Sequence, residues 1–310
     1  MKKVLYAFIT LFLLAMIAAW VLIPAKLTIS SAVAIPATDI GTERFLVNEN
    51  AWHRWWPGHP AASDSLFAMN QDRYRLTEKF YKSASILIHH GADTLPSKIF
   101  IIPFQIDTAV VEWKCTMPSG INPFTRFSAY LTARTIKRNM DSVLAGLKSF
   151  LSSPENVYGI NIEKVSTKDT LYLSFKKLLD KQPSTPQIYQ LIRQIQAYAT
   201  AKGARQTGYP IYNVTRITDQ RLQLMAAVPI DKALPDKDGY AMKHMVRGSF
   251  MSTEVTGGEY TVAAASRSLS QFFSDYRKTS MAMNYTMLIT DRLLQPDSTR
   301  WITRLYEPVF

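Results

Sequence analysis

Apolar and polar residues alternate along several short segments in the first half of the chain, which is the period of half-buried strands. These predicted strands cover residues 27–35, 74–80, 82–89, 98–104 and 108–117. A short helix is expected at 38–46, with Thr38 or Asp39 as its N-cap. From residue 122 to about 152 the period becomes helical, with an apolar stripe formed by Ile136, Met140, Val143, Leu144, Leu147 and Leu151.

The second half shows one order of elements twice, namely strand, helix, strand, strand. The first copy is predicted from strand 170–177, a helix opened by Ser184-Thr185-Pro186 and ended by Gly203, and strands 211–217 and 221–230. The second is predicted from strand 249–255, helix 259–278, and strands 284–290 and 300–306. A further strand is expected at 158–164, after a linker at 153–156. Two such units, each unable to bury its apolar face alone, predict one sheet with both helices on one side.

Gly257-Gly258 precedes the second of these helices. Free backbone N–H groups at a helix start attract anions, so the pair raises the hypothesis of a phosphate site. No Lys-Ser/Thr follows the pair and no G-x-G-x-x-G contains it. A tight turn is the favoured interpretation.

The N-terminus carries an uncharged apolar run from Val4 to Ile23 after Lys2 and Lys3. At about 1.5 Å per residue the run is long enough to cross a bilayer core, and it exceeds the apolar region of most signal peptides. We therefore expect residues 1–24 to be an uncleaved single-pass anchor in a bacterial cytoplasmic membrane. The flanking lysines predict that the rest of the chain lies on the outer, periplasmic side.

Composition narrows the class of protein. The remaining length fits about two domains. The net charge of +12 is scattered without a Lys/Arg-rich block, so nucleic acid is not an expected partner. Cys115 is the single cysteine, which excludes an intramolecular disulfide and a cysteine zinc cluster. His89-His90 has no partner ligands at metal-binding spacing, so a solvated turn is expected there.

The segment from Trp52 to Pro57 reads W-x-x-W-W-P and is the densest aromatic cluster of the chain. It either lines a ligand mouth or membrane interface, or closes one end of a core. Together with the strand 27–35 and the long closing helix, it makes residues 25–152 resemble the helix-grip domains of the polyketide-cyclase and START-like (SRPBCC) superfamily. That resemblance implies a long helix packed over a curved sheet, with an apolar cavity between them.

Residues 156–310 resemble the GyrI-like effector-binding domains of bacterial transcription regulators. The match is carried by Gly208-x-Pro210 with Tyr212, by residues 227–230 and 256–260, and by residues 305–309. The resemblance implies a cleft between two halves, lined by aromatic residues, for flat or cationic organic molecules. Members that bind cations or hydrolyse electrophiles have an acidic residue in the penultimate strand, where this chain has Thr286. Arg304 instead favours a neutral or anionic ligand, unless it is a solvated strand residue.

The sequence thus predicts an α+β protein, with an N-terminal transmembrane helix, a helix-grip domain and a duplicated GyrI-like domain. The expected function is non-catalytic binding of a small hydrophobic or aromatic molecule, with no cofactor, metal or catalytic residue. The predicted cleft residues are Tyr212, Met225, Tyr260, Tyr285, Trp301 and Tyr306. Two alternatives stay open: a hydrolase of small reactive compounds that uses Glu254 or Glu259, and a structural or partner-binding ectodomain.

Overall fold

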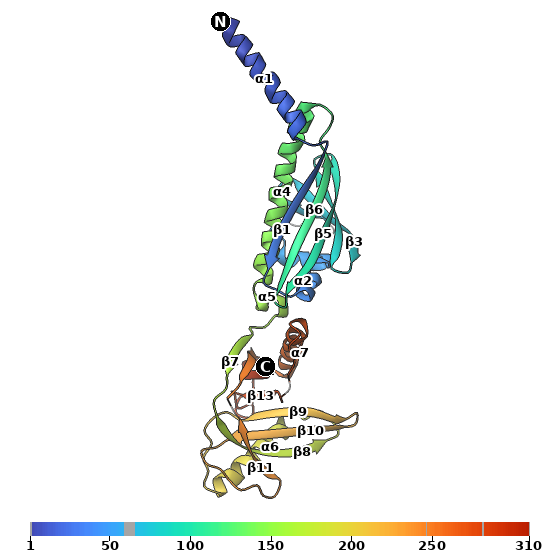
Figure 1. The fold of residues 1–310 in the computed structure, drawn as a ribbon. Coiled ribbons are helices and arrows are strands. Elements are labelled where there is room, and N and C mark those ends of the chain that lie inside the picture. The colour runs from blue at the N-terminus through green and yellow to red at the C-terminus, as the bar shows by residue number, and fades with distance from the viewer. Residues whose placement is uncertain (1, 59–65, 246, 281, 310) are drawn as a thin grey trace. The chain divides into compact units, whose positions relative to one another are not determined.

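The computed structural model describes residues 2–58, 66–245, 247–280 and 282–309. The chain divides into two compact units, Met1–Ser153 and Pro154–Phe310 (Figure 1). Both units combine helices with an antiparallel sheet, so the mixed α+β class is confirmed.

The N-terminal unit places two short helices between its first and second strands and one long helix after its last strand. Its elements are α1 (Lys2–Leu22), β1 (Lys26–Ile35), α2 (Asp39–Leu46), α3 (Glu49–Trp55), β2 (Phe67–Met69), β3 (Asp72–Phe80), β4 (Ser83–His90), β5 (Asp93–Gln105), β6 (Thr108–Pro118) and α4 (Pro123–Leu151). The strands form one antiparallel sheet in the order β1-β6-β5-β4-β3-β2.

Helix α1 corresponds to the apolar run at the N-terminus. In the part of the chain that the structure describes, no helix is both long enough and apolar enough to span a membrane. The predicted anchor at residues 4–23 is therefore not supported. The end of α1 is tied to the start of α4, because Arg126 donates hydrogen bonds to the carbonyls of Trp20 and Ile23 and its guanidinium lies over the Trp20 ring.

Helix α4 packs on the sheet through the stripe that the sequence predicts. Ile136, Met140, Val143, Leu144, Leu147 and Leu151 are all buried, which confirms the predicted face. A polar cluster also joins α4 to the sheet. The Asn139 amide donates to the Asp72 carboxylate at 2.7 Å, and His90 Nδ1 lies 2.5 Å from the other oxygen of that carboxylate. His90 is therefore part of strand β4 and of this cluster, and the predicted solvated turn at His89-His90 is wrong.

The tryptophan cluster belongs to the core. Trp52, Trp55 and Trp56 are buried, and the rings of Trp52 and Trp56 stack with centroids 5.0 Å apart. Each indole N–H donates to a backbone carbonyl, for example from Trp52 to Leu46 at 2.8 Å. Because the rings are buried and their polar atoms are satisfied, the cluster closes the core, as the second of the two interpretations predicts.

A long helix over an antiparallel sheet, with two short helices after the first strand, is the arrangement that the helix-grip resemblance implies. Large buried side chains, among them Trp113, Tyr74 and Phe67, lie on the face of the sheet that α4 covers. Membership of the SRPBCC superfamily stays a prediction.

The C-terminal unit contains the repeated order of elements. It consists of α5 (Pro154–Tyr158), β7 (Glu163–Ser166), β8 (Thr170–Leu179), α6 (Thr185–Ala201), β9 (Ile211–Thr218), β10 (Arg221–Pro229), β11 (Tyr240–Met245), β12 (Ser249–Thr256), α7 (Glu259–Asp275), β13 (Tyr285–Leu288), a 3-10 turn η1 (Ser298–Arg300) and β14 (Ile302–Val309). The strands form a single sheet in the order β11-β8-β10-β9-β13-β14-β12-β7.

The two copies of the strand-helix-strand-strand order arrange their strands in the same way. In the first copy β10 lies between β8 and β9, and in the second β14 lies between β12 and β13. The copies join where β9 pairs with β13, at Tyr212 opposite Thr286. This is the predicted single sheet, and it is the arrangement that the GyrI-like resemblance implies.

The strand register shows that both helices cover the same face of this sheet. Cross-strand partners share a face, and one row runs from Ala226 through Tyr212 and Thr286 to Leu305. Ala226 packs in the cluster that buries α6, and Leu305 packs in the cluster that buries α7. The centre of the row, Tyr212 and Thr286, therefore lies between the two helices.

The C-terminal unit contains one helix and one strand that the sequence does not predict. Residues 154–158 form helix α5 instead of a linker and the start of a strand. The Tyr158 ring packs edge-on against Phe272, and its hydroxyl donates to Asp275 at 2.9 Å, so this segment belongs to the second unit. Strand β11, which was not predicted, pairs with β8 at the end of the sheet.

Candidate functional site

A pocket of about 540 Å³ lies over the middle of the second sheet, between α6 and α7. Its floor is formed by β9, β13 and β14, and its walls by the start of α6, by α7 and by the loop after β13. It is lined by Gln182, Pro183, Ile188, Tyr212, Asn213, Val214, Glu259, Tyr260, Val262, Ala263, Ser266, Leu269, Asn284, Tyr285, Thr286, Arg292, Leu305, Tyr306 and Glu307. The pocket exists because the two copies join edge to edge and their helices leave the central strands uncovered.

Tyr212 and Thr286 are cross-strand neighbours at the centre of this floor. Burial raises the pKa of the Tyr212 phenol above its usual range, and both the nearby Arg292 guanidinium and the hydrogen bond with the Thr286 side chain oppose that rise. The phenol is therefore protonated at neutral pH and presents a ring and a neutral hydroxyl to the pocket. Neither side chain supplies a negative charge at the position where a carboxylate would hold a cation.

Arg292 brings a buried positive charge to the pocket wall. Its residue surface is 5% exposed, and its Nη2 donates to the Thr303 hydroxyl at 2.9 Å. The guanidinium carbon lies 4.8 Å from the centroid of the Trp301 ring, and the backbone N–H donates to the Tyr189 hydroxyl at 3.0 Å. These contacts hold both the guanidinium and the backbone of Arg292 in place.

The charge of Arg292 is not neutralised within the described part of the chain. No carboxylate there lies within ion-pair distance of its guanidinium, and its Nε atom is buried without a hydrogen-bond partner. Buried charges are normally paired, because an unpaired one retains its full desolvation cost. This arginine is therefore the least satisfied polar group of the site.

Two carboxylates also line the pocket, and each already accepts a hydrogen bond from a neutral donor. The Thr185 hydroxyl donates to Glu259 at the start of α7. The Asn284 amide donates to Glu307 at 2.9 Å, near the opposite end of β14. The groups in the pocket thus place a positive charge, two carboxylates and a phenol around a mixed apolar and polar surface.

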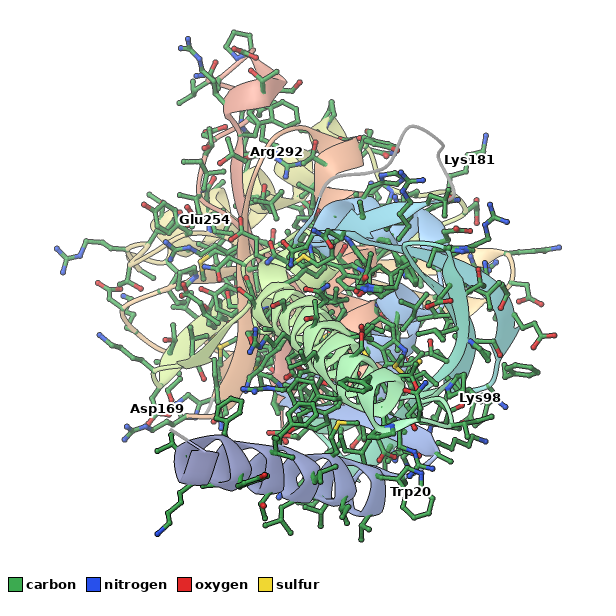
Figure 2. All side chains as sticks on the ribbon, turned by 90° about the horizontal axis from the view of Figure 1, so that it is seen from above. Trp20, Lys98, Asp169, Lys181, Glu254 and Arg292 are labelled. Atoms are coloured by element: carbon green, nitrogen blue, oxygen red, sulfur yellow. The ribbon has the colours of Figure 1, made fainter. Side chains whose placement is uncertain are left out.

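Glu254 and Arg304 lie outside the pocket. Arg304 donates to Glu254 at 2.6 Å from the neighbouring strand, and Figure 2 shows Glu254 apart from Arg292 on this unit. Glu254 and Glu259 are therefore not brought together as an acid–base pair. Of the two interpretations of Arg304, the structure supports the solvated strand residue, because the register places its half-exposed side chain on the outer face of the sheet.

The structure brings four of the six predicted cleft residues to the pocket: Tyr212, Tyr260, Tyr285 and Tyr306. Tyr260 stands at the rim and is 83% exposed. Tyr285 and Tyr306 border the pocket, but strand alternation directs their rings to the opposite face. There they stack with centroids 4.7 Å apart in a second apolar cluster. Direct contact of these residues with a ligand stays a prediction.

The other two predicted residues do not line the pocket. Met225 follows Leu224 and precedes Ala226, which both pack toward α6, so its own side chain takes the other face. Trp301 supports the pocket indirectly, through the face that it offers to Arg292. Sequence reasoning missed Arg292 itself. The available signal was a lone arginine inside the apolar context of Leu288-Ile289 and Leu293-Leu294.

No family model and no characterised protein matches the sequence at a significant level. Among solved structures, the C-terminal domain of EcmrR matches 49% of this chain over 98% of its own length, with 13% identity and a TM-score of 0.43. SAV2435 bound to tetraphenylphosphonium matches 49% over 94% of its length, with 14% identity and a TM-score of 0.35. A hydrolase from Listeria innocua matches 48% over 91% of its length, with 10% identity and a TM-score of 0.36.

Proposed function

We propose that the unit Pro154–Phe310 binds a small organic molecule of hydrophobic or aromatic character, without turnover, in the pocket between α6 and α7. The observation that carries the proposal is the pocket itself. Its volume of about 540 Å³ lies within the range of small-molecule sites, which usually combine apolar walls with a few fixed polar groups. Tyr212, Leu269 and Leu305 supply apolar surface here, while Arg292 and Thr286 supply polar groups.

The absence of an assembled acid–base pair favours binding over hydrolysis. Glu254 is engaged with Arg304 on the other face, and Glu259 accepts a hydrogen bond from Thr185. Within the described residues, no group of His, Cys, Asp or Glu is placed to hold a metal ion. The pocket therefore offers recognition groups without an evident nucleophile and base.

A pair of matched variants on α7 tests the proposal. Ser266 lines the pocket, and Ser270 lies one turn further along the same helix outside it; both are exposed. A set of planar aromatic compounds is screened by thermal shift with the full chain. Compounds that bind are expected to raise the melting temperature by mass action. Ser266→Trp fills the pocket and removes the shift, whereas Ser270→Trp retains it.

Two results contradict the proposal. If Ser266→Trp and Ser270→Trp respond alike to every compound that shifts the native chain, then the compounds bind elsewhere. If no compound shifts the native chain, the structural or partner-binding alternative is favoured.

A further inference from the structure

The pocket contains one group whose electrostatic requirement the described chain does not meet, and this group is Arg292. Its guanidinium is held against Trp301 and by Thr303, so it does not reach solvent by changing rotamer without losing both contacts. With 5% of its surface exposed, the residue is largely removed from bulk water, which normally compensates an unpaired arginine. A buried guanidinium in this state favours an anion beside it.

The carboxylates of the pocket do not meet this requirement. Glu307 and Thr303 are four residues apart on β14, which corresponds to about 13 Å along a strand. Because Thr303 holds Arg292, Glu307 lies at the far end of the floor. Glu259 is at the rim, where it is exposed and accepts a hydrogen bond from Thr185. The inner wall beside Arg292 therefore keeps a positive character.

We propose that the ligand of this pocket carries a planar anionic group, a carboxylate or a close equivalent, and that Arg292 binds it. The inference rests on the proposed function and adds the chemical class of the ligand. Guanidinium and carboxylate groups match in geometry and form two parallel hydrogen bonds. The adjoining apolar floor, with the Tyr212 ring at its centre, takes the aromatic or aliphatic body of the same molecule.

Thr286 is consistent with this assignment. A carboxylate on the floor next to Tyr212 would repel an anionic ligand, whereas a threonine hydroxyl is neutral and offers a hydrogen bond. A cation, by contrast, would meet the guanidinium on the inner wall without a carboxylate beside it. The positive charge of the inner wall beside Arg292, with neutral Thr286 and Tyr212 next to it, thus supports an anion over a cation at that end of the pocket.

Three compounds of one shape test the inference with the full chain: 2-naphthoate, 2-naphthamide and 2-naphthamidine. They share one ring system and carry a negative, neutral and positive planar group. By titration calorimetry we expect 2-naphthoate to bind about tenfold or more tightly than 2-naphthamide, the size of effect that a charge-assisted bidentate contact gives. 2-Naphthamidine is expected to bind most weakly.

Two arginine variants identify the residue that recognises the anion. Arg292→Met is expected to remove the preference for 2-naphthoate over 2-naphthamide. Arg300→Met, at an exposed arginine of the same segment that pairs with Asp297 at 3.4 Å, is expected to retain it. The order of the three compounds on the unmodified chain decides the inference even if Arg292→Met fails to fold.

The inference is overturned if 2-naphthamidine binds most tightly, if the charge makes no difference, or if Arg292→Met keeps the preference. It is also overturned if none of the three compounds binds at millimolar concentration. In each of these cases the proposed binding function is judged separately, by the response of the Ser266→Trp and Ser270→Trp variants.

Discussion

At the scale of single residues, the chemistry of the pocket depends on a few positions. Tyr212 was predicted from the sequence as a cleft residue, and it lies at the centre of the floor. Tyr285 and Tyr306 were predicted for the same reason, yet their rings pack on the opposite face. A shift of one residue along a strand exchanges the faces, and residue type alone does not reveal which face a short strand presents. Arg292 lies in a loop, where no periodicity marks it.

Thr286 gives the first prediction at this scale. Thr286→Glu places a carboxylate on the pocket floor beside Tyr212, so we expect the preference among the naphthyl compounds to move from 2-naphthoate toward 2-naphthamidine. The relative affinity of the two compounds should change by about tenfold or more, as for other close charge pairs. Calorimetric titration measures it. Thr286→Gln is the neutral control and should leave the order unchanged; a similar change in both variants would contradict the assigned floor.

Cys115 gives a second prediction, in the N-terminal unit. Burial, with a smaller effect of the nearby Asp72 charge, raises the pKa of its thiol from 9.0 to about 11. Since the thiolate is the nucleophile, iodoacetamide at pH 8 should label the native chain about 100-fold more slowly than the chain in urea, as followed by mass spectrometry. Equal labelling rates in the two conditions would show that the thiol is accessible.

The raised pKa of the Cys115 thiol also predicts that the free energy of unfolding depends on pH. The thiol is protonated more firmly in the folded chain, so its contribution to the free energy of unfolding is complete below pH 9.0 and is lost as the pH rises toward about 11. Urea unfolding of the native chain and of Cys115→Ala is compared across this pH range. The difference between the two chains separates the contribution of the Cys115 thiol from that of the buried tyrosines. A difference between the two chains that is constant with pH would contradict it.

At the scale of elements, long amphipathic segments were predictable because their apolar period is local. Helices α4, α6 and α7 and most strands begin and end within a few residues of the predicted bounds. Among the short elements, helix α2 was predicted together with its N-cap Thr38, whereas helix α5 and strand β11 were not. Helix α5 and strand β11 are stabilised by contacts with distant parts of the chain, such as Tyr158 with Phe272 and the pairing of β11 with β8. Local sequence carries little information about such contacts.

The turn at Gly257-Gly258 yields the prediction at this scale. Gly257 has a φ of 144°, its N–H donates to the Trp301 carbonyl at 2.8 Å, and a Cβ there would lie 2.8 Å from the Thr261 hydroxyl oxygen. Gly258 is the N-cap of α7 with an ordinary extended conformation. The glycine pair is thus a turn that directs α7 back over the sheet, as the favoured interpretation predicted.

Gly257→Ser should therefore destabilise the chain by about 1–3 kcal/mol, because a side chain is strained in this backbone conformation. Gly258→Ser should change stability by a few tenths of a kcal/mol at most, since serine is a good N-cap. Urea unfolding followed by circular dichroism compares the two. Equal effects of the two substitutions would contradict the assigned geometry of the turn.

At the scale of the whole molecule, every residue that lines the pocket belongs to the unit Pro154–Phe310. We therefore expect a chain of residues 154–310 to bind 2-naphthoate with a dissociation constant within about threefold of that of the full chain, a difference of less than 1 kcal/mol. A chain of residues 160–310 lacks Tyr158 and its contacts with α7, so it should melt at a lower temperature. A folded 154–310 chain without affinity would show that the site needs the first unit.

We propose that the pocket between α6 and α7 binds an organic anion whose charged group contacts Arg292. The most direct test is a crystal structure of the protein with 2-naphthoate. We expect the naphthyl ring over Tyr212 and the carboxylate within hydrogen-bond distance of the Arg292 guanidinium, about 2.7–2.9 Å. A ligand bound elsewhere, or bound in this pocket with its carboxylate turned away from Arg292, would contradict it.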